Sequence, residues 1–140
     1  MKLGIAVAVM VVASTNFVAI ALAENPMHVR RLITTRECPG CDLYEANIGP
    51  VNLRGANLTG ANLYRANLRF SDLRDATLNR ANLYKADLRG ADLSGANIYG
   101  TDLTEANLCG AIMPEGNKST QGCPENVPKT NPNPERKTNP

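Results

Sequence analysis

Leucine or isoleucine recurs at every fifth position of this chain between residues 43 and 108. An α-helix would advance by about 500° over five residues and scatter these side chains around its surface. A flat strand would send every second one to the opposite face, because its side chains alternate. The pattern instead predicts a solenoid, in which the chain turns a corner once per pentad and returns each apolar side chain to a shared interior. The fourteen positions are Leu43, Ile48, Leu53, Leu58, Leu63, Leu68, Leu73, Leu78, Leu83, Leu88, Leu93, Ile98, Leu103 and Leu108.

The residues around each leucine support this interpretation. Two positions before it the residue is small, and it is alanine in ten of the fourteen pentads, as a narrow interior requires. Immediately before the leucine stands Asn or Asp, with Thr77 as the exception. Short polar side chains bond nearby backbone and tolerate unusual φ angles, so we expect them at the corners. The two residues after the leucine vary freely and are expected to face solvent.

The motif Ala-Asn/Asp-Leu-x-x resembles that of the pentapeptide-repeat family, closely over residues 41–110 and loosely over residues 111–115. The resemblance implies an all-β fold, namely a right-handed quadrilateral β-helix with four pentads in each coil. At this size the repeat would make about 3.5–4 coils.

Three tyrosines agree with four pentads per coil. Tyr44, Tyr64 and Tyr84 are spaced by 20 residues and each follows a leucine. They would stack in a column on one outer face, and stacking alone accounts for the spacing. The alternative is a docking strip for a protein partner, since tyrosine is enriched at interfaces.

Charged side chains recur at the same spacing. One column would place opposite charges together at its first and third steps. It consists of Glu45, Arg65, Lys85 and Glu105. On two other faces like charges would stack, Arg54 on Arg74 and Arg69 on Arg89, unless Asp72, Asp75 or Asp87 offsets them. Arg54 and Arg74 are therefore a second candidate surface, for an anion or an acidic partner.

Residues 1–23 are predicted to be a signal peptide. Lys2 precedes an apolar run that ends in the Ala-Leu-Ala sequence typical of a signal-peptidase site, and cleavage is expected before Glu24. The alternative is an uncleaved membrane anchor, because the run is nearly long enough to span a bilayer. Export to a periplasm follows, or, by the family resemblance, to a thylakoid lumen.

Both ends of a solenoid expose unpaired strand edges, so caps are expected. Residues 24–37 are assigned to an N-terminal cap helix and linker, with Asn25 as N-cap and Pro26 in the first turn. An apolar face would cover the first coil. It would consist of Val29, Leu32 and Ile33.

The β-helix itself is assigned to residues 38–115. Residues 116–140 are predicted to be a disulfide-tethered, largely disordered tail, because Pro, Asn, Lys and Thr dominate from Asn117 onward. If this tail leaves the last coil open, the rod could stack end to end, so the chain is expected to be a monomer or a weak end-to-end dimer.

Four cysteines flank the repeat, and an even number in an exported chain suggests disulfides. Cys38 and Cys41 form Cys-Pro-Gly-Cys at the start of the repeat, and a local bond between them is plausible. Cys109 and Cys123 bracket its end and would form the second bond, since crossed pairings would have to span the whole rod. Exported cyanobacterial members of the family look similar, with Cys-x-Gly-Cys before the first pentad.

These observations favour a non-enzymatic, exported structural or protein-interaction module with an unidentified protein partner. One alternative is a thiol-disulfide redox protein that uses Cys38 and Cys41, although a thioredoxin-like motif opens a helix in a βαβ unit and this one leads into pentads. A second is a gyrase-binding DNA mimic. Those relatives are cytoplasmic and strongly acidic, whereas residues 41–115 hold seven basic and nine acidic residues.

No catalytic residue, metal site or cofactor is predicted. His28 is the only histidine, so a Cys/His zinc set of familiar spacing and a Ser-His-Asp triad are both excluded. The formal charge of +2, which loss of Lys2 would lower to +1, indicates no nucleic-acid partner and no membrane contact after cleavage.

Overall fold

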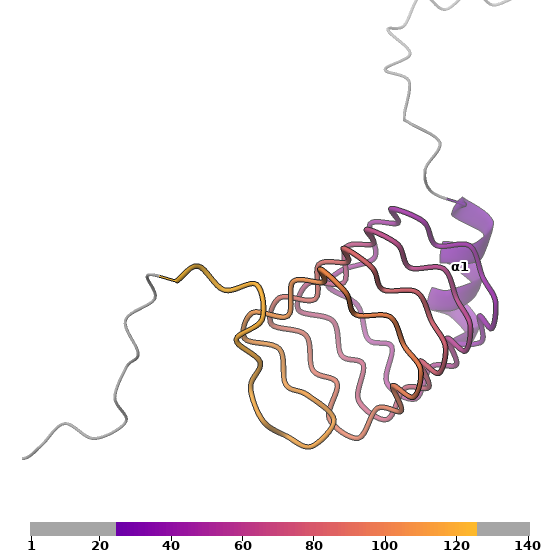
Figure 1. The fold of residues 1–140 in the computed structure, drawn as a ribbon. Coiled ribbons are helices and arrows are strands. Elements are labelled where there is room, and N and C mark those ends of the chain that lie inside the picture. The colour runs from indigo at the N-terminus through magenta and orange to yellow at the C-terminus, as the bar shows by residue number, and fades with distance from the viewer. Residues whose placement is uncertain (1–24, 126–140) are drawn as a thin grey trace, which may run out of the picture.

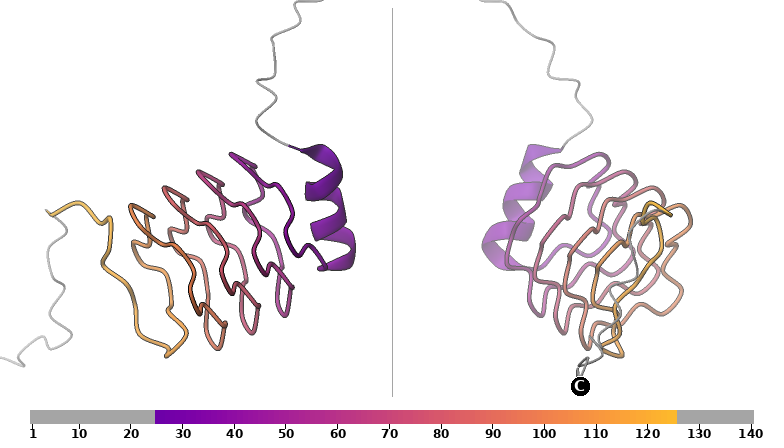
Figure 2. Two further views of the ribbon diagram at one scale, coloured as in Figure 1. Left: turned by 45° about the vertical axis from the view of Figure 1, so that its right-hand side comes forward. Right: turned by 90° about the vertical axis from the view of Figure 1, so that its left-hand side faces the viewer.

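The computed structural model describes residues 25–125. They form a solenoid of stacked coils, with helix α1 lying across its N-terminal end (Figure 1). The signal peptide predicted for residues 1–23 and the tail beyond residue 125 lie outside the described residues. The two side views show the coils in register along one axis (Figure 2).

Each coil contains 20 residues, because parallel bridges join positions that are 20 apart, such as Asn62 and Asn82. Within the repeat, the residue that forms a parallel bridge is the one before each leucine position, and a turn usually follows. Hydrogen bonds between coils flank the bridge. Leu63 N–H donates to the carbonyl of Asn82 at 2.8 Å, and Asn62 N–H donates to the carbonyl of Cys41 at 2.8 Å. Four pentads therefore close one coil.

The Asn and Asp side chains lie on the flat sides of the coil, so their predicted place at the corners was wrong. Their backbone makes the bridge, while the side chain points outward and accepts a hydrogen bond from the residue two positions on. Asn82 Oδ1, for example, accepts from Tyr84 N–H at 3.0 Å. The short polar side chain thus stabilises the turn although it belongs to the straight side before it. This hydrogen bond explains why Asn or Asp occurs at the position.

The leucines fill the axis of the solenoid. Leu53, Leu63 and Leu83 are fully buried, and Ala61 and Ala81, two positions before the second and third of these leucines, are buried beside them. Ser71 occupies one of these alanine positions with a side chain only 1% exposed, and its hydroxyl has no hydrogen-bond partner. The interior is therefore apolar and narrow, and Ser71 is the one fully buried polar side chain among residues 25–125.

Gly49 is required by a close approach of two coils. A Cβ atom at this position would lie 2.6 Å from the carbonyl oxygen of Arg69, a backbone atom that cannot move aside independently. Gly60 is different, because it occupies a turn with a φ of +64° and has open space around it. The first glycine is selected by space and the second by backbone conformation.

Helix α1 spans Pro26–Thr35 and covers the first coil. Asn25 is its N-cap, as the sequence predicts, and Leu32 is fully buried. Ile33, however, is 48% exposed, so its predicted contact with the first coil was wrong. Its side chain lies on the outer face of the helix, because it is one residue away from the position that points inward.

Residues 117–123 are ordered against the last coil, although the sequence favours disorder from Asn117 onward. Lys118 pairs with Ile112 in an antiparallel bridge, and Gln121 O accepts from Leu108 N–H at 3.0 Å. The side-chain amide of Gln121 also donates to the carbonyls of Leu103 and Ala106. Unpaired backbone groups at the end of the solenoid supply the partners that composition alone does not reveal.

Candidate functional site

The three tyrosines form a stacked column along one corner of the solenoid, which we call the tyrosine column. The ring centroids of Tyr44 and Tyr64 are 5.2 Å apart with an interplanar angle of 2°, and those of Tyr64 and Tyr84 are 5.6 Å apart at 26°. The coil spacing sets this arrangement, because each tyrosine occupies the same turn position. The hydroxyl of Tyr84 donates to Glu105 Oε1 at 2.6 Å, and this bond raises the pKa of Tyr84.

Charged residues run beside the tyrosine column, and opposite charges meet at its first and third steps, as the sequence predicts. Arg65 lies 3.1 Å from Glu45, and Lys85 lies 3.4 Å from Glu105. The guanidinium of Arg65 is also 5.3 Å from the centroid of the Tyr64 ring. Ring faces in the column are therefore occupied by neighbouring rings and cations, and the ring edges remain available to a partner.

Arg54 and Arg74 lie on the opposite corner of the coil, two pentads away from the tyrosine column. Arg54 pairs with Asp75 at 3.1 Å, while Arg74 holds Asp72 through two hydrogen bonds of 2.8 and 2.6 Å. These bonds lower the pKa of Asp72 to about 2. The aspartates thus offset the like charges, and this corner does not present two free guanidinium groups.

The second pair of like charges is offset in the same way. Asp87 accepts two hydrogen bonds from Arg89 and lies 3.9 Å from Arg69. The hydrogen bond from Arg89 lowers the pKa of Asp87. Phe70 follows Arg69 and is 63% exposed, with its ring packed over Gly90 of the next coil. Sequence reasoning missed this aromatic side chain, because no other aromatic residue occurs at its spacing.

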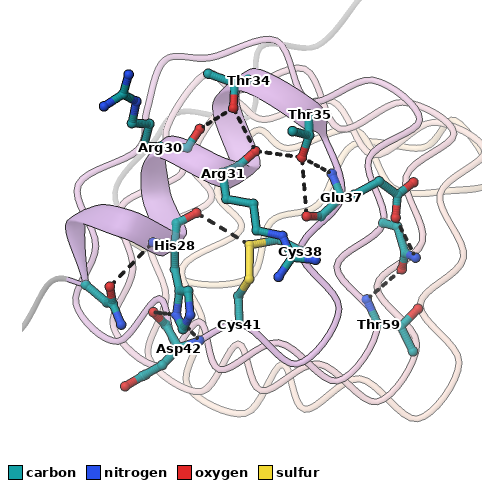
Figure 3. The surroundings of a disulfide bond; sticks show 12 residues. His28, Arg30, Arg31, Thr34, Thr35, Glu37, Cys38, Cys41, Asp42 and Thr59 are labelled. Carbon is teal, nitrogen blue, oxygen red and sulfur yellow. Dashed lines mark hydrogen bonds between the residues drawn. A yellow bond between two sulfur atoms is a disulfide. The ribbon is translucent and has the colours of Figure 1, made fainter.

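Both disulfides join cysteines that are close in sequence, Cys38 with Cys41 and Cys109 with Cys123. The first is buried beneath α1, where Cys38 Sγ lies 3.4 Å from the carbonyl oxygen of His28 (Figure 3). A thiolate that attacks a disulfide must reach one of its sulfur atoms, so this bond is shielded from exchange. The second bond ties residues 117–123 to the last coil.

His28 connects α1 to the solenoid (Figure 3). Its Nδ1 atom accepts a hydrogen bond from the backbone N–H of Asp42 at 3.0 Å. Within residues 25–125, no group of three His, Cys, Asp or Glu side chains is placed to bind a metal ion. No helix in this part of the chain has the length and apolar character needed to cross a bilayer.

The sequence matches the family described as pentapeptide repeats over residues 41–80 and 78–113, with eight copies. No curated protein matches it.

Several solved structures are similar to parts of this chain. HetL, a pentapeptide repeat protein involved in heterocyst differentiation regulation from the cyanobacterium Nostoc sp. strain PCC 7120, is 37% identical over 59% of this chain and 43% of its own, with a TM-score of 0.37. This chain therefore spans less than half of HetL. Another pentapeptide repeat protein from Nostoc is 32% identical over 59% of this chain and 74% of its own, with a TM-score of 0.46. A third, from the thylakoid lumen of Arabidopsis thaliana, is 29% identical over 56% of this chain and 62% of its own, with a TM-score of 0.30.

Proposed function

Since this chain belongs to the pentapeptide repeat family, we propose that it is a non-enzymatic, exported protein-interaction module that acts through its outer surface. In this proposal it is a right-handed, four-sided rod of about 3.5–4 coils, with α1 as its N-terminal cap. The observation that carries the proposal is the filled axis, where Leu53, Leu63 and Leu83 are fully buried. A rod whose interior is occupied by its own side chains can bind other molecules only from outside.

Export to a periplasm or thylakoid lumen is supported by the cysteines. All four are held in disulfides, which form and persist mainly in oxidising compartments. The apolar residues 1–23 with their Ala-Leu-Ala end support the same location. This location also argues against a gyrase-binding role, as does a surface whose carboxylates are paired with arginines.

The redox alternative, with Cys38 and Cys41 as the reactive pair, is less well supported. Their side chains are 0% and 2% exposed, and α1 covers them. Catalytic disulfides need an accessible sulfur atom. Rapid reduction of this bond by a dithiol in the folded protein would favour the redox function over the proposed one.

The tyrosine column is the proposed contact surface. It is a continuous aromatic strip with hydroxyl groups at its edge, and both features are common in protein interfaces. Thr104 occupies the same turn position in the next coil, so threonine is compatible with the fold there. The triple variant Tyr44→Thr/Tyr64→Thr/Tyr84→Thr should therefore keep the fold and remove the strip.

The experiment compares proteins recovered from the exported fraction by wild type, the tyrosine variant and a control. The matched control is Arg54→Ser/Arg74→Ser on the opposite corner, where Ser94 already occupies the third position. A protein partner recovered by wild type should be lost with the tyrosine variant and kept with the control. The Kd for binding of this partner to the purified control should equal its Kd for wild type. An unchanged set of proteins for the tyrosine variant would show that the column is structural.

A further inference from the structure

Among the described residues, a segment covers the C-terminal end of the solenoid on two of its four sides. Residues 117–123 pair with the sides that contain Asn107 and Ile112, and Ser119 O accepts from Gly110 N–H at 2.9 Å. The sides that contain Asn97 and Asp102 pair with no backbone segment of residues 25–125, although the side-chain amide of Gln121 donates to the carbonyl of Leu103 at 3.2 Å. We call the backbone of residues 96–105 the open edge.

The open edge has backbone N–H and carbonyl groups that are unpaired within the described part of the chain. In every earlier coil the equivalent groups form hydrogen bonds with the next coil. One coil below, Leu78 N–H donates to Asn97 O and Leu83 N–H donates to Asp102 O, both at 2.8 Å. The corresponding N–H groups of Ile98 and Leu103 have no acceptor within residues 25–125. The carbonyls of Ala96 and Thr101 likewise receive no donor there.

The core is also less covered at this end. Leu78 and Leu83 are fully buried, whereas Ile98 and Leu103, which stand above them in the same columns, are half-buried. Tyr99, at the corner between the two sides, is 76% exposed. Unpaired backbone groups beside partly exposed apolar side chains favour association with another strand.

We propose that the open edge pairs with the open edge of a second copy of this chain, in antiparallel orientation. The chain itself shows that an antiparallel strand can complete this end, because the bridge between Ile112 and Lys118 is antiparallel. A two-fold axis through the corner at Tyr99 would place the Asn97 side of one copy against the Asp102 side of the other. Each copy then supplies the same surface, as closed dimers require.

This register satisfies the exposed groups reciprocally. In an antiparallel pair centred on Asn97 and Asp102 of the second copy, Ile98 N–H donates to Thr101 O of the second copy. Leu103 N–H of the second copy donates to Ala96 O, and the two-fold axis repeats both bonds. Four backbone groups at each open edge are thereby paired.

The side chains are complementary in the same register. Asn97 would face Asp102 of the second copy, so that the amide donates to the carboxylate. The solenoid already contains this combination one coil apart, where Asn62 Nδ2 donates to Asp42 Oδ1 at 3.1 Å. The two-fold axis therefore produces two such Asn97–Asp102 pairs between the copies.

The pairing is expected to stop at two copies. Helix α1 covers the other end of the rod, and His28 and Thr35 occupy first-coil N–H groups that a stacked coil would need. Residues 117–123 add a layer to the other two sides of the C-terminal end, so the two rods must meet with their axes inclined or offset. A filament would need free edges at both ends.

The test uses sedimentation velocity of the exported chain with both disulfides intact, from about 1 μM to about 1 mM, the range of weak affinities. The mass should rise toward a dimer with concentration, and amide exchange at Ile98 and Leu103 should slow in parallel. A monomer at all concentrations overturns the proposal.

Two isosteric substitutions test the register. Asn97→Asp would put two carboxylates opposite each other at both contacts between residues 97 and 102. It should raise the Kd of the dimer about threefold to tenfold. The swapped variant Asn97→Asp/Asp102→Asn restores one amide and one carboxylate at each place and should recover the wild-type affinity. Both substitutions keep the Oδ1 acceptors for Tyr99 N–H and Thr104 N–H, so the fold is preserved.

The control is Ile33→Asp on the outer face of α1, which should leave the dimer unchanged. If Ile33→Asp dissociates the dimer, the copies meet through α1 and the proposal is wrong. If the swapped variant is as weak as Asn97→Asp alone, the two sides do not face each other as proposed.

Discussion

His28 Nδ1 accepts a hydrogen bond from the backbone N–H of Asp42, and so α1 supplies the acceptor that a preceding coil would provide. In later coils the same N–H bonds to the coil before, as Asn62 does to Cys41. The helix therefore continues the hydrogen-bond ladder as well as covering the core. A solenoid can end in this way without leaving its first edge unpaired.

Replacement of His28 by Phe should lower the free energy of unfolding by about 1 kcal/mol, because the ring packs similarly but cannot accept a hydrogen bond. Urea denaturation followed by circular dichroism measures this change. Met27→Leu is the control, since Met27 is 71% exposed and should contribute little. Equal stability of wild type and His28→Phe would show that water replaces the imidazole at no cost.

Ser71→Ala should stabilise the protein by about 1 kcal/mol, since it removes a buried hydroxyl that has no partner. Thr101→Ala at the equivalent position should do the opposite, because Thr101 Oγ1 donates to the carbonyl of Leu78 at 2.7 Å. The midpoint of thermal unfolding should rise for the first variant and fall for the second. The same sign for both would contradict the assigned hydrogen bonding.

Gly49→Ala should cost more than Gly60→Ala. The added Cβ at Gly49 meets the backbone of Arg69 at 2.6 Å and forces the coils apart, which costs about 2–3 kcal/mol. At Gly60 the only penalty is the left-handed conformation, about 1 kcal/mol. Urea unfolding of both variants compares the two penalties, and a larger loss for Gly60→Ala would refute this assignment.

The stabilising contribution of the Asp72 carboxylate should be lost in acid. Its folded pKa of about 2 lies below the ordinary carboxyl value near 4, because Arg74 donates two hydrogen bonds to it. The unfolded chain therefore takes up a proton first, so the stabilisation is complete above about pH 5 and is lost as the pH falls toward 2. Asp72→Asn should flatten the unfolding curve in this range, and Arg74→Gln should flatten it equally. No change in either variant would mean that solvent screens the pair.

The bond between Cys109 and Cys123 should hold residues 117–123 on the last coil. Cys109→Ser/Cys123→Ser opens a loop with a sequence separation of 14 and should cost about 3 kcal/mol. Amide exchange at Leu108 and Gly110 should accelerate, because their acceptors are Gln121 and Ser119. Unchanged exchange at these two amides would show that the segment stays in place without the disulfide.

The sequence by itself determined the solenoid. Leucine at every fifth position fits neither a helix nor a flat strand, so a corner in each pentad is the remaining way to bury the repeat positions from Leu43 to Leu93. The spacing of Tyr44, Tyr64 and Tyr84 indicated four pentads per coil, and the bridges have that period. A strict repeat is readable because each residue position has one environment.

Only the tertiary structure decided how the repeat is finished at its ends. The outward position of Ile33 and the bond from Asp42 to His28 depend on how α1 lies on the first coil. The pairing of Lys118 with Ile112 likewise depends on unpaired groups of the last coil. These contacts occur once each, so no periodic pattern in the sequence marks them. Their partners are set by how segments outside the pentads pack against the first and last coils.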